Sequence, residues 1–108
     1  MAVSADEARR LALSLPGSVE RDHHGRPSFR VADRIFATLW DAAHMNVMLD
    51  EDGILTAVAA SPTVCTEVWW GKMLRAVRVS LELIEPDALA ELLTDAWEQK
   101  VPARPGRG

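Results

Sequence analysis

Apolar and polar positions along this chain repeat with two different periods, and each period predicts a different kind of element. Apolar residues recur at helical spacing over 8–15, 54–59 and 89–97. Over 77–83 they alternate with polar residues at every second position, as in a half-buried strand. The pattern therefore predicts a mixture of helices and strands.

Residues at the ends of the three helical segments support these assignments. Ser4 and Glu7 have the spacing of a capping box, and the Pro-Gly pair at 16–17 ends the first helix. Acidic residues at 50–52 suit the start of the second helix, where the helix dipole favours negative charge. Pro86 suits the first position of the last helix.

The strands are expected between these helices. Residues 19–24 are polar enough for an irregular strand at a sheet edge. Further strands are predicted at 28–31, 34–40, 45–50, 64–70 and 73–84. The hairpin tip at Ala32-Asp33 lacks the glycine that a tight two-residue turn favours, so we expect a longer or bulged loop there.

The expected architecture is one α+β domain with the element order α-β-β-β-β-α-β-β-α. An antiparallel sheet has its helices packed on one face, so that the stripe over 89–97 covers the alternating strand. With 108 residues and 48% hydrophobic content, the chain has room for one core, assigned to residues 1–100. The Pro/Gly-rich tail at 101–108 is expected to be disordered.

Several short motifs resemble those of one known family. They are Leu15-Pro16-Gly17, Gly25-Arg26-Pro27, Phe29-Arg30-Val31, the run Ile-Phe-Ala-Thr-Leu at 35–39, and Trp70-Gly71. In these motifs, and in their order along the chain, the sequence resembles the MmcQ/YjbR family. The resemblance implies a fold like those of CyaY and the secretion chaperones, and a DNA-binding protein with wing-like hairpins. The chain has Asp33-Arg34 where the family has Gly-Lys. Arg34 keeps the positive charge of the lysine, but Asp33 in place of glycine changes the chemistry of that turn.

Charge gives a mixed indication of the partner. The formal net charge of -4 counts against a dedicated nucleic-acid binder. A local basic patch can nevertheless act on an acidic protein, and here the charges segregate. Basic residues mark the two predicted hairpins, whereas acids collect at 50–52 and along the last helix, where Asp87, Glu91 and Asp95 mark the outer face.

Four tryptophans are the other unusual feature of the composition. Trp97 lies on the apolar stripe of the last helix, and Trp40 ends a strand and can cover the sheet. Trp69 and Trp70 are neighbours on a strand and point to opposite faces, so we expect one in the core and choose Trp70 for the surface.

An aromatic side chain beside basic residues at a hairpin tip can stack on a base or enter a groove. The predicted nucleic-acid-binding residues are Arg26, Arg30, Arg34, Trp70, Lys72, Arg75 and Arg78. Duplex DNA is the expected partner. The alternative is a module that binds a protein or a small molecule with the same Trp-lined surface.

No pattern indicates catalysis, a cofactor or a metal. His23 and His24 adjoin on a strand and face opposite sides, so one metal ion cannot easily take both. No recognised pattern surrounds the candidate nucleophiles Ser28, Thr38, Cys65 and Ser80. Because no Gly-rich phosphate loop is present either, we expect a protein that is not an enzyme.

Cysteine usage and hydropathy bear on the compartment. Cys65 is the only cysteine, acids occupy the N-terminal segment where a signal peptide has bases, and no apolar run approaches the roughly 20 residues that span a bilayer. We therefore expect a cytoplasmic protein without a membrane partner.

Overall fold

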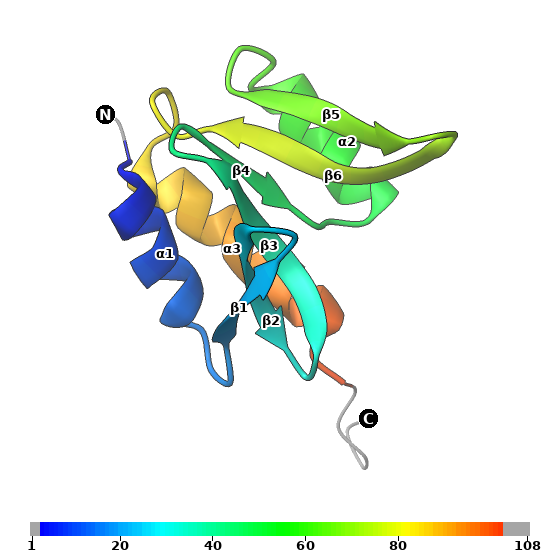
Figure 1. Ribbon diagram of the computed structural model, residues 1–108. Coiled ribbons are helices and arrows are strands. Elements are labelled where there is room, and N and C mark those ends of the chain that lie inside the picture. The colour runs from blue at the N-terminus through cyan, green and yellow to red at the C-terminus, as the bar shows by residue number, and fades with distance from the viewer. Residues whose placement is uncertain (1–2, 103–108) are drawn as a thin grey trace, which may run out of the picture.

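The computed structural model describes residues 3–102 and contains three helices and six strands in that range (Figure 1). In chain order they are α1 (Ala5–Leu13), β1 (Val19–His23), β2 (Arg26–Val31), β3 (Arg34–Asp41), β4 (His44–Val47), α2 (Glu51–Ala60), β5 (Cys65–Trp70), β6 (Met73–Ser80) and α3 (Pro86–Lys100). This succession confirms the predicted element order. The expected disorder of the tail concerns mainly residues 103–108, which lie outside the described residues.

The six strands form one antiparallel sheet with the order β1-β2-β3-β4-β6-β5. The first four strands form a meander, and β6 then pairs with β4, which leaves β5 at the far edge. β1 occupies the other edge, as its polar sequence predicts. The tip of the β5–β6 hairpin projects beyond the rest of the sheet (Figure 1).

All three helices cover one face of the sheet, as predicted. The expectation that the stripe over 89–97 covers the alternating strand is wrong, because α3 packs on β3 and β4, while α2 packs on β5 and β6. α1 contacts both α3 and β3. Between these layers the largest fully buried side chains include Phe29, Phe36, Met45, Leu89 and Leu93. Figure 1 looks onto the opposite face of the sheet, which carries no helix.

The helix ends follow the caps expected from the sequence. The Ser4 hydroxyl accepts a hydrogen bond from the Glu7 backbone N–H at 3.0 Å, and the Glu7 carboxylate accepts one from the Ser4 N–H. Asp50 caps α2 by accepting from the Gly53 N–H at 2.8 Å.

None of the helices described within residues 3–102 is long and apolar enough to cross a bilayer.

The β2–β3 turn differs from the expected longer loop. Val31 pairs directly with Arg34, so the turn contains only Ala32 and Asp33, with φ angles of 52° and 63°. Positive φ is unfavourable for a side chain with Cβ, but both strands continue up to the turn and hold it in this shape. The bulge occurs instead inside the hairpin, at Phe29/Arg30.

The last strand is shorter than the alternating pattern predicts. β6 ends at Ser80, because its partner β4 begins at His44, directly opposite Ser80. The chain then turns, and the backbone N–H groups of Leu83 and Ile84 both donate to the Ser80 carbonyl. Leu81 and Ile84 are buried by this turn, whereas Leu83 is 57% exposed.

Candidate functional site

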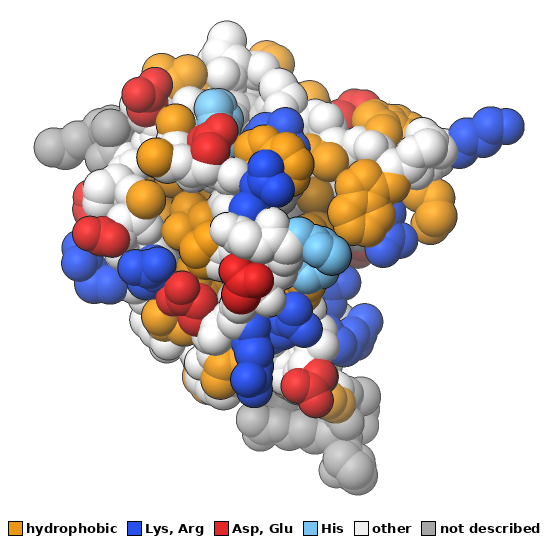
Figure 2. Space-filling view, in the orientation of Figure 1, with side chains coloured by type: hydrophobic (Ala, Val, Ile, Leu, Met, Phe, Trp, Pro, Cys, Tyr) orange, Lys and Arg blue, Asp and Glu red, His pale blue; other side chains and the backbone are white. Residues whose placement is uncertain are grey.

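A cleft lies between the two hairpins that carry the predicted binding residues. One wall comes from β2 and β3 and the other from the outer ends of β5 and β6, and the enclosed volume is about 580 Å³. On this face, Figure 2 shows Lys and Arg side chains beside large hydrophobic side chains, with Asp and Glu side chains interspersed among them. The two predicted wings therefore border one common cavity.

The cleft lining is basic. Among the described residues that line it are Arg26, Arg34, Arg75 and Lys100, together with His23 and His24, and this lining contains no Asp or Glu. A cavity whose lining holds several cations and no carboxylate favours the approach of an anion. The net negative charge of the chain does not extend to this cavity.

Lys100 brings the end of α3 into this basic cluster. The Arg34 guanidinium donates a hydrogen bond to the Lys100 carbonyl at 3.4 Å, which links the start of β3 to the last residue of α3. Burial lowers the pKa of the Lys100 ammonium, and the positive charges of Arg34 and Arg75 lower that pKa further. The three cations therefore repel one another, and a bound anion relieves this repulsion.

Trp40 lines the cleft, and two guanidinium groups lie against its ring. The guanidinium carbon of Arg26 lies 3.9 Å from the centroid of the Trp40 ring, and that of Arg78 lies 4.4 Å from it. Arg26 also donates from Nε to the Trp40 carbonyl at 2.8 Å. These cation–π contacts hold two of the predicted binding residues against an aromatic ring.

A row of polar residues crosses the sheet on the face without helices. Ser28 pairs with Thr38, Thr38 with Asn46, and Asn46 with Arg78. Ser28, Thr38 and Asn46 are the buried polar residues among those described. Directly paired residues share a face, so this row gives the base of the site a polar character.

Hydrogen bonds in this row fix two arginines. Arg78 donates from Nε to the Asn46 side-chain oxygen at 2.9 Å, and Arg30 donates from Nε to the Ser28 hydroxyl at 3.2 Å. The Ser28 hydroxyl in turn donates to the Arg21 carbonyl at 2.8 Å. Each guanidinium keeps further N–H groups for a ligand.

The expectation that Trp69 is buried is wrong. Trp69 is 51% exposed and Trp70 is 59% exposed, and the Trp69 indole N–H donates to Glu67. Strand alternation does send the two rings to different faces, but this end of the hairpin projects past the helices, so neither face is covered. Trp70 is exposed and lines the cleft, in agreement with the prediction that it is a surface residue. The centroid of its ring lies 5.1 Å from the guanidinium carbon of Arg75.

The structure brings most of the predicted residues together. Arg26, Arg34, Trp70 and Arg75 line the cleft, and Arg78 reaches it through Trp40. Arg30 lies on the same face, held by Ser28. Lys72 is separate, since it lies in the exposed turn of the β5–β6 hairpin and is absent from the lining.

The histidines and candidate nucleophiles have ordinary structural surroundings. The rings of His23 and His24 lie 4.5 Å apart at the mouth of the cleft. Within residues 3–102, no group of three or more His, Cys, Asp or Glu side chains is arranged to hold a metal ion. Cys65 is buried on the helix side of the sheet, and burial raises the pKa of its thiol.

Trp40, Lys100 and the polar row are absent from the set predicted from the sequence. Thr38 and Asn46 stand at polar positions within otherwise apolar strands, which is the signal of a second, polar face. Trp40 directly follows that pattern on β3. Lys100 could not be found in this way, because only the packing of α3 across the sheet brings it to the cleft.

In a comparison against protein families, residues 13–99 match the YjbR family model, which covers most of the chain, including all six strands and α2 completely. The chain therefore belongs to the YjbR family. Comparison with curated proteins and with solved structures gives no significant match.

Proposed function

We propose that this protein binds DNA in the cleft between its two hairpins, as a cytoplasmic binding protein without enzymatic activity. The observation that carries the proposal is the cluster of Arg34, Arg75 and Lys100 beside the exposed ring of Trp70, in a cavity whose described lining holds no carboxylate. Phosphates bind such cations, and an exposed indole stacks on a base.

The electrostatics of the cleft support an anionic ligand. Burial lowers the pKa of Lys100, and the positive charges of Arg34 and Arg75 lower it further, so these cations raise the energy of the empty site. A phosphate among them replaces repulsion by charge-assisted hydrogen bonds. The arginines held by Trp40, Ser28 and Asn46 are already ordered, so binding restricts few additional side-chain rotations.

The test is a fluorescence-anisotropy titration with a labelled duplex and with one of its single strands, each at two salt concentrations. If the cleft contacts phosphates, log affinity falls with log salt, and each lost contact lowers the slope by about 0.9 for a duplex. Failure of both DNA forms to bind at low salt overturns the proposal.

Three charge reversals identify the surface used. Arg75→Glu, inside the cleft, should weaken binding by about tenfold or more, equivalent to about 1.4 kcal/mol. Arg10→Glu, on the exposed side of α1, makes the same change in net charge away from the cleft and should have little effect. Lys72→Glu distinguishes insertion of the hairpin tip, which needs Lys72, from binding within the cleft.

A second candidate function follows from the size of the cavity. Its volume of about 580 Å³ lies within the range of small-molecule sites, so an anionic aromatic molecule could fill it without a polymer. A nucleoside monophosphate added as competitor distinguishes these cases. Displacement of DNA at micromolar concentration favours the small ligand, whereas competition only at millimolar concentration favours DNA.

A further inference from the structure

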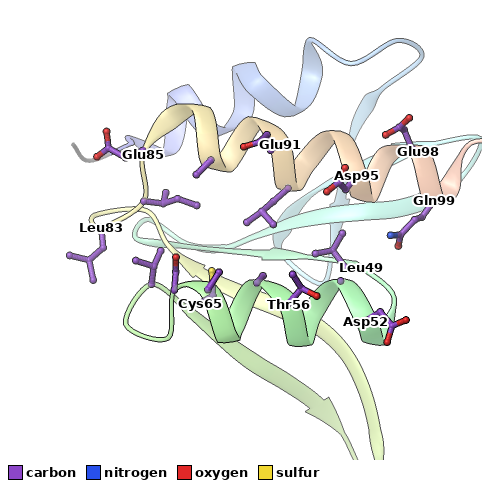
Figure 3. A pocket seen from close by; sticks show the side chains of 18 residues that line it. Leu49, Asp52, Thr56, Cys65, Leu83, Glu85, Glu91, Asp95, Glu98 and Gln99 are labelled. Carbon is purple, nitrogen blue, oxygen red and sulfur yellow. The ribbon is translucent and has the colours of Figure 1, made fainter.

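A second groove lies on the opposite side of the sheet, between α2 and α3, with a volume of about 950 Å³ (Figure 3). Apolar side chains make up its floor: Leu49, Ala57, Val64, Cys65, Ile84 and Leu92. Burial raises the pKa of the Cys65 thiol, so this side chain is uncharged at neutral pH and forms part of the apolar floor. At one end of the groove, Leu83 is 57% exposed.

Acidic side chains border this floor from both helices. Asp52 comes from α2, and Glu91, Asp95 and Glu98 come from α3 (Figure 3). The three residues on α3 extend over about 10 Å at 1.5 Å per residue. Among the described residues lining the groove there is no Lys or Arg, so its charge is opposite in sign to that of the cleft.

The sequence predicted a solvated outer face at Asp87, Glu91 and Asp95. The structure separates these residues, because Glu91 and Asp95 border the groove while Asp87 is absent from its lining. A hydrogen bond at 2.8 Å from the Asp50 backbone N–H to the Gln99 side chain joins the start of α2 to the end of α3. The groove walls are therefore fixed relative to each other near that end.

We propose that the groove between α2 and α3 binds a cationic amphipathic helix from a protein partner. An apolar floor with three carboxylates along α3 and one at the start of α2 matches a helix whose apolar stripe has Lys or Arg beside it, most of them on the side that faces α3. Burial of the stripe supplies the affinity, and the carboxylates select a basic partner and its orientation. Of the residues that line this groove, only Leu49 also lines the cleft proposed for DNA.

The test uses a fluorescein-labelled peptide of 18 residues, with Leu on one helical face and Lys beside it. Its control is a scrambled peptide of the same composition without an apolar face. By anisotropy, the full-length protein should bind the amphipathic peptide about tenfold or more tightly than the scrambled one. Equal binding of the two peptides, or no binding, overturns the proposal.

Two variants place the peptide in the groove. Glu91→Lys/Asp95→Lys should weaken peptide binding by about tenfold or more. The control Glu51→Lys/Glu82→Lys has the same net charge, but both changes lie outside the lining of the groove, so it should bind the peptide like wild type. Ala88→Trp fills the groove without changing charge, at a position that is already exposed, and should weaken binding to a similar extent.

One further measurement does not depend on any variant folding. In ¹⁵N-labelled wild-type protein, the peptide should shift amide signals of α2 and α3 and leave those of β2 and β3 unchanged. Shifts confined to other elements contradict the proposal. Salt-sensitive self-association seen by sedimentation, without binding of the peptide, would assign the groove to a second copy of this chain and overturn it as well.

Discussion

At Trp40, two guanidinium groups from different strands lie against one indole ring, with Arg26 on β2 and Arg78 on β6. Each cation–π contact contributes about 0.5–1 kcal/mol where water has access, and more where it does not. The contacts also restrict the side-chain rotation of both arginines. Trp40 therefore orders Arg26 in the cleft and Arg78 beside it, while Trp70, with one guanidinium at 5.1 Å, remains more open to a ligand.

The adjacent tryptophans give a prediction at this scale. Trp70→Ala should reduce affinity for single-stranded DNA by about 1–3 kcal/mol if one base stacks on the ring. Trp69→Ala, its neighbour outside the cleft lining, should leave affinity within about twofold, which anisotropy titrations of both variants can measure.

Stability measurements on the same variants check that the two rings are exposed. Denaturant unfolding should show a change of no more than about 0.5 kcal/mol for each exchange. Phe36→Ala, in the core, should cost about 3–5 kcal/mol in the same assay. Heavy destabilisation by Trp69→Ala would mean that this end of the hairpin is covered.

Between elements, the polar row couples β4 to β6 through the hydrogen bond from Arg78 to Asn46. Asn46→Ala should cost about 1–3 kcal/mol, because it leaves a part-buried guanidinium without its acceptor. In Asn46→Ala/Arg78→Met that unpaired donor is absent, so the two costs should not add. A double-mutant cycle from denaturant unfolding should give a coupling energy of about 0.5 kcal/mol or more, and additive costs would contradict the role of this bond.

The junction of α3 with the cleft predicts a pH dependence of DNA binding. The pKa of Lys100 is lowered from 10.5, so its ammonium loses charge earlier than an ordinary lysine as pH rises. Bound phosphate favours the charged form, and DNA affinity should therefore fall as pH rises from 8 towards the pKa of Lys100.

Arginine at position 100 keeps its charge over this whole range. Lys100→Arg should therefore flatten the alkaline fall in DNA affinity, whereas Lys72→Arg, at the hairpin tip, should leave the wild-type profile. Anisotropy titrations at several pH values measure both. A profile that is the same in wild type and Lys100→Arg would exclude Lys100 from the binding site.

Local patterns predicted the elements well, but they did not predict how far each element continues. Caps and periodicity are properties of neighbouring residues, so the succession of helices and strands along the chain could be predicted directly. The end of β6 at Ser80 depends on where β4 begins, and the exposure of Trp69 depends on how far the helices reach along the hairpin. For the same reason Lys100, distant in sequence from Arg34 and Arg75, could not be assigned to the site.

Over the whole molecule, a net charge of -4 is divided between two faces of opposite sign. Cations converge on the cleft at the face without helices, and carboxylates border the groove between α2 and α3. The two cavities adjoin at Leu49, which lines both, and at the end of α3, where Gln99 lines the groove and Lys100 lines the cleft. The net charge of the whole chain therefore does not indicate the charge of the ligand that either cavity binds.

The different charged linings predict that the two sites act nearly independently. The cations Arg34 and Arg75 line only the cleft and the carboxylates of Glu91 and Asp95 line only the groove, so saturating the groove with the amphipathic peptide should change the DNA dissociation constant by less than about threefold. Glu91→Lys/Asp95→Lys should likewise retain DNA binding, and Arg75→Glu should retain peptide binding. A titration of DNA at fixed excess peptide measures the coupling, with the scrambled peptide as control. Mutual exclusion of the two ligands would show that the peptide occupies the basic cleft or that one ligand distorts the shared sheet, and the two faces would then have to be treated as a single site.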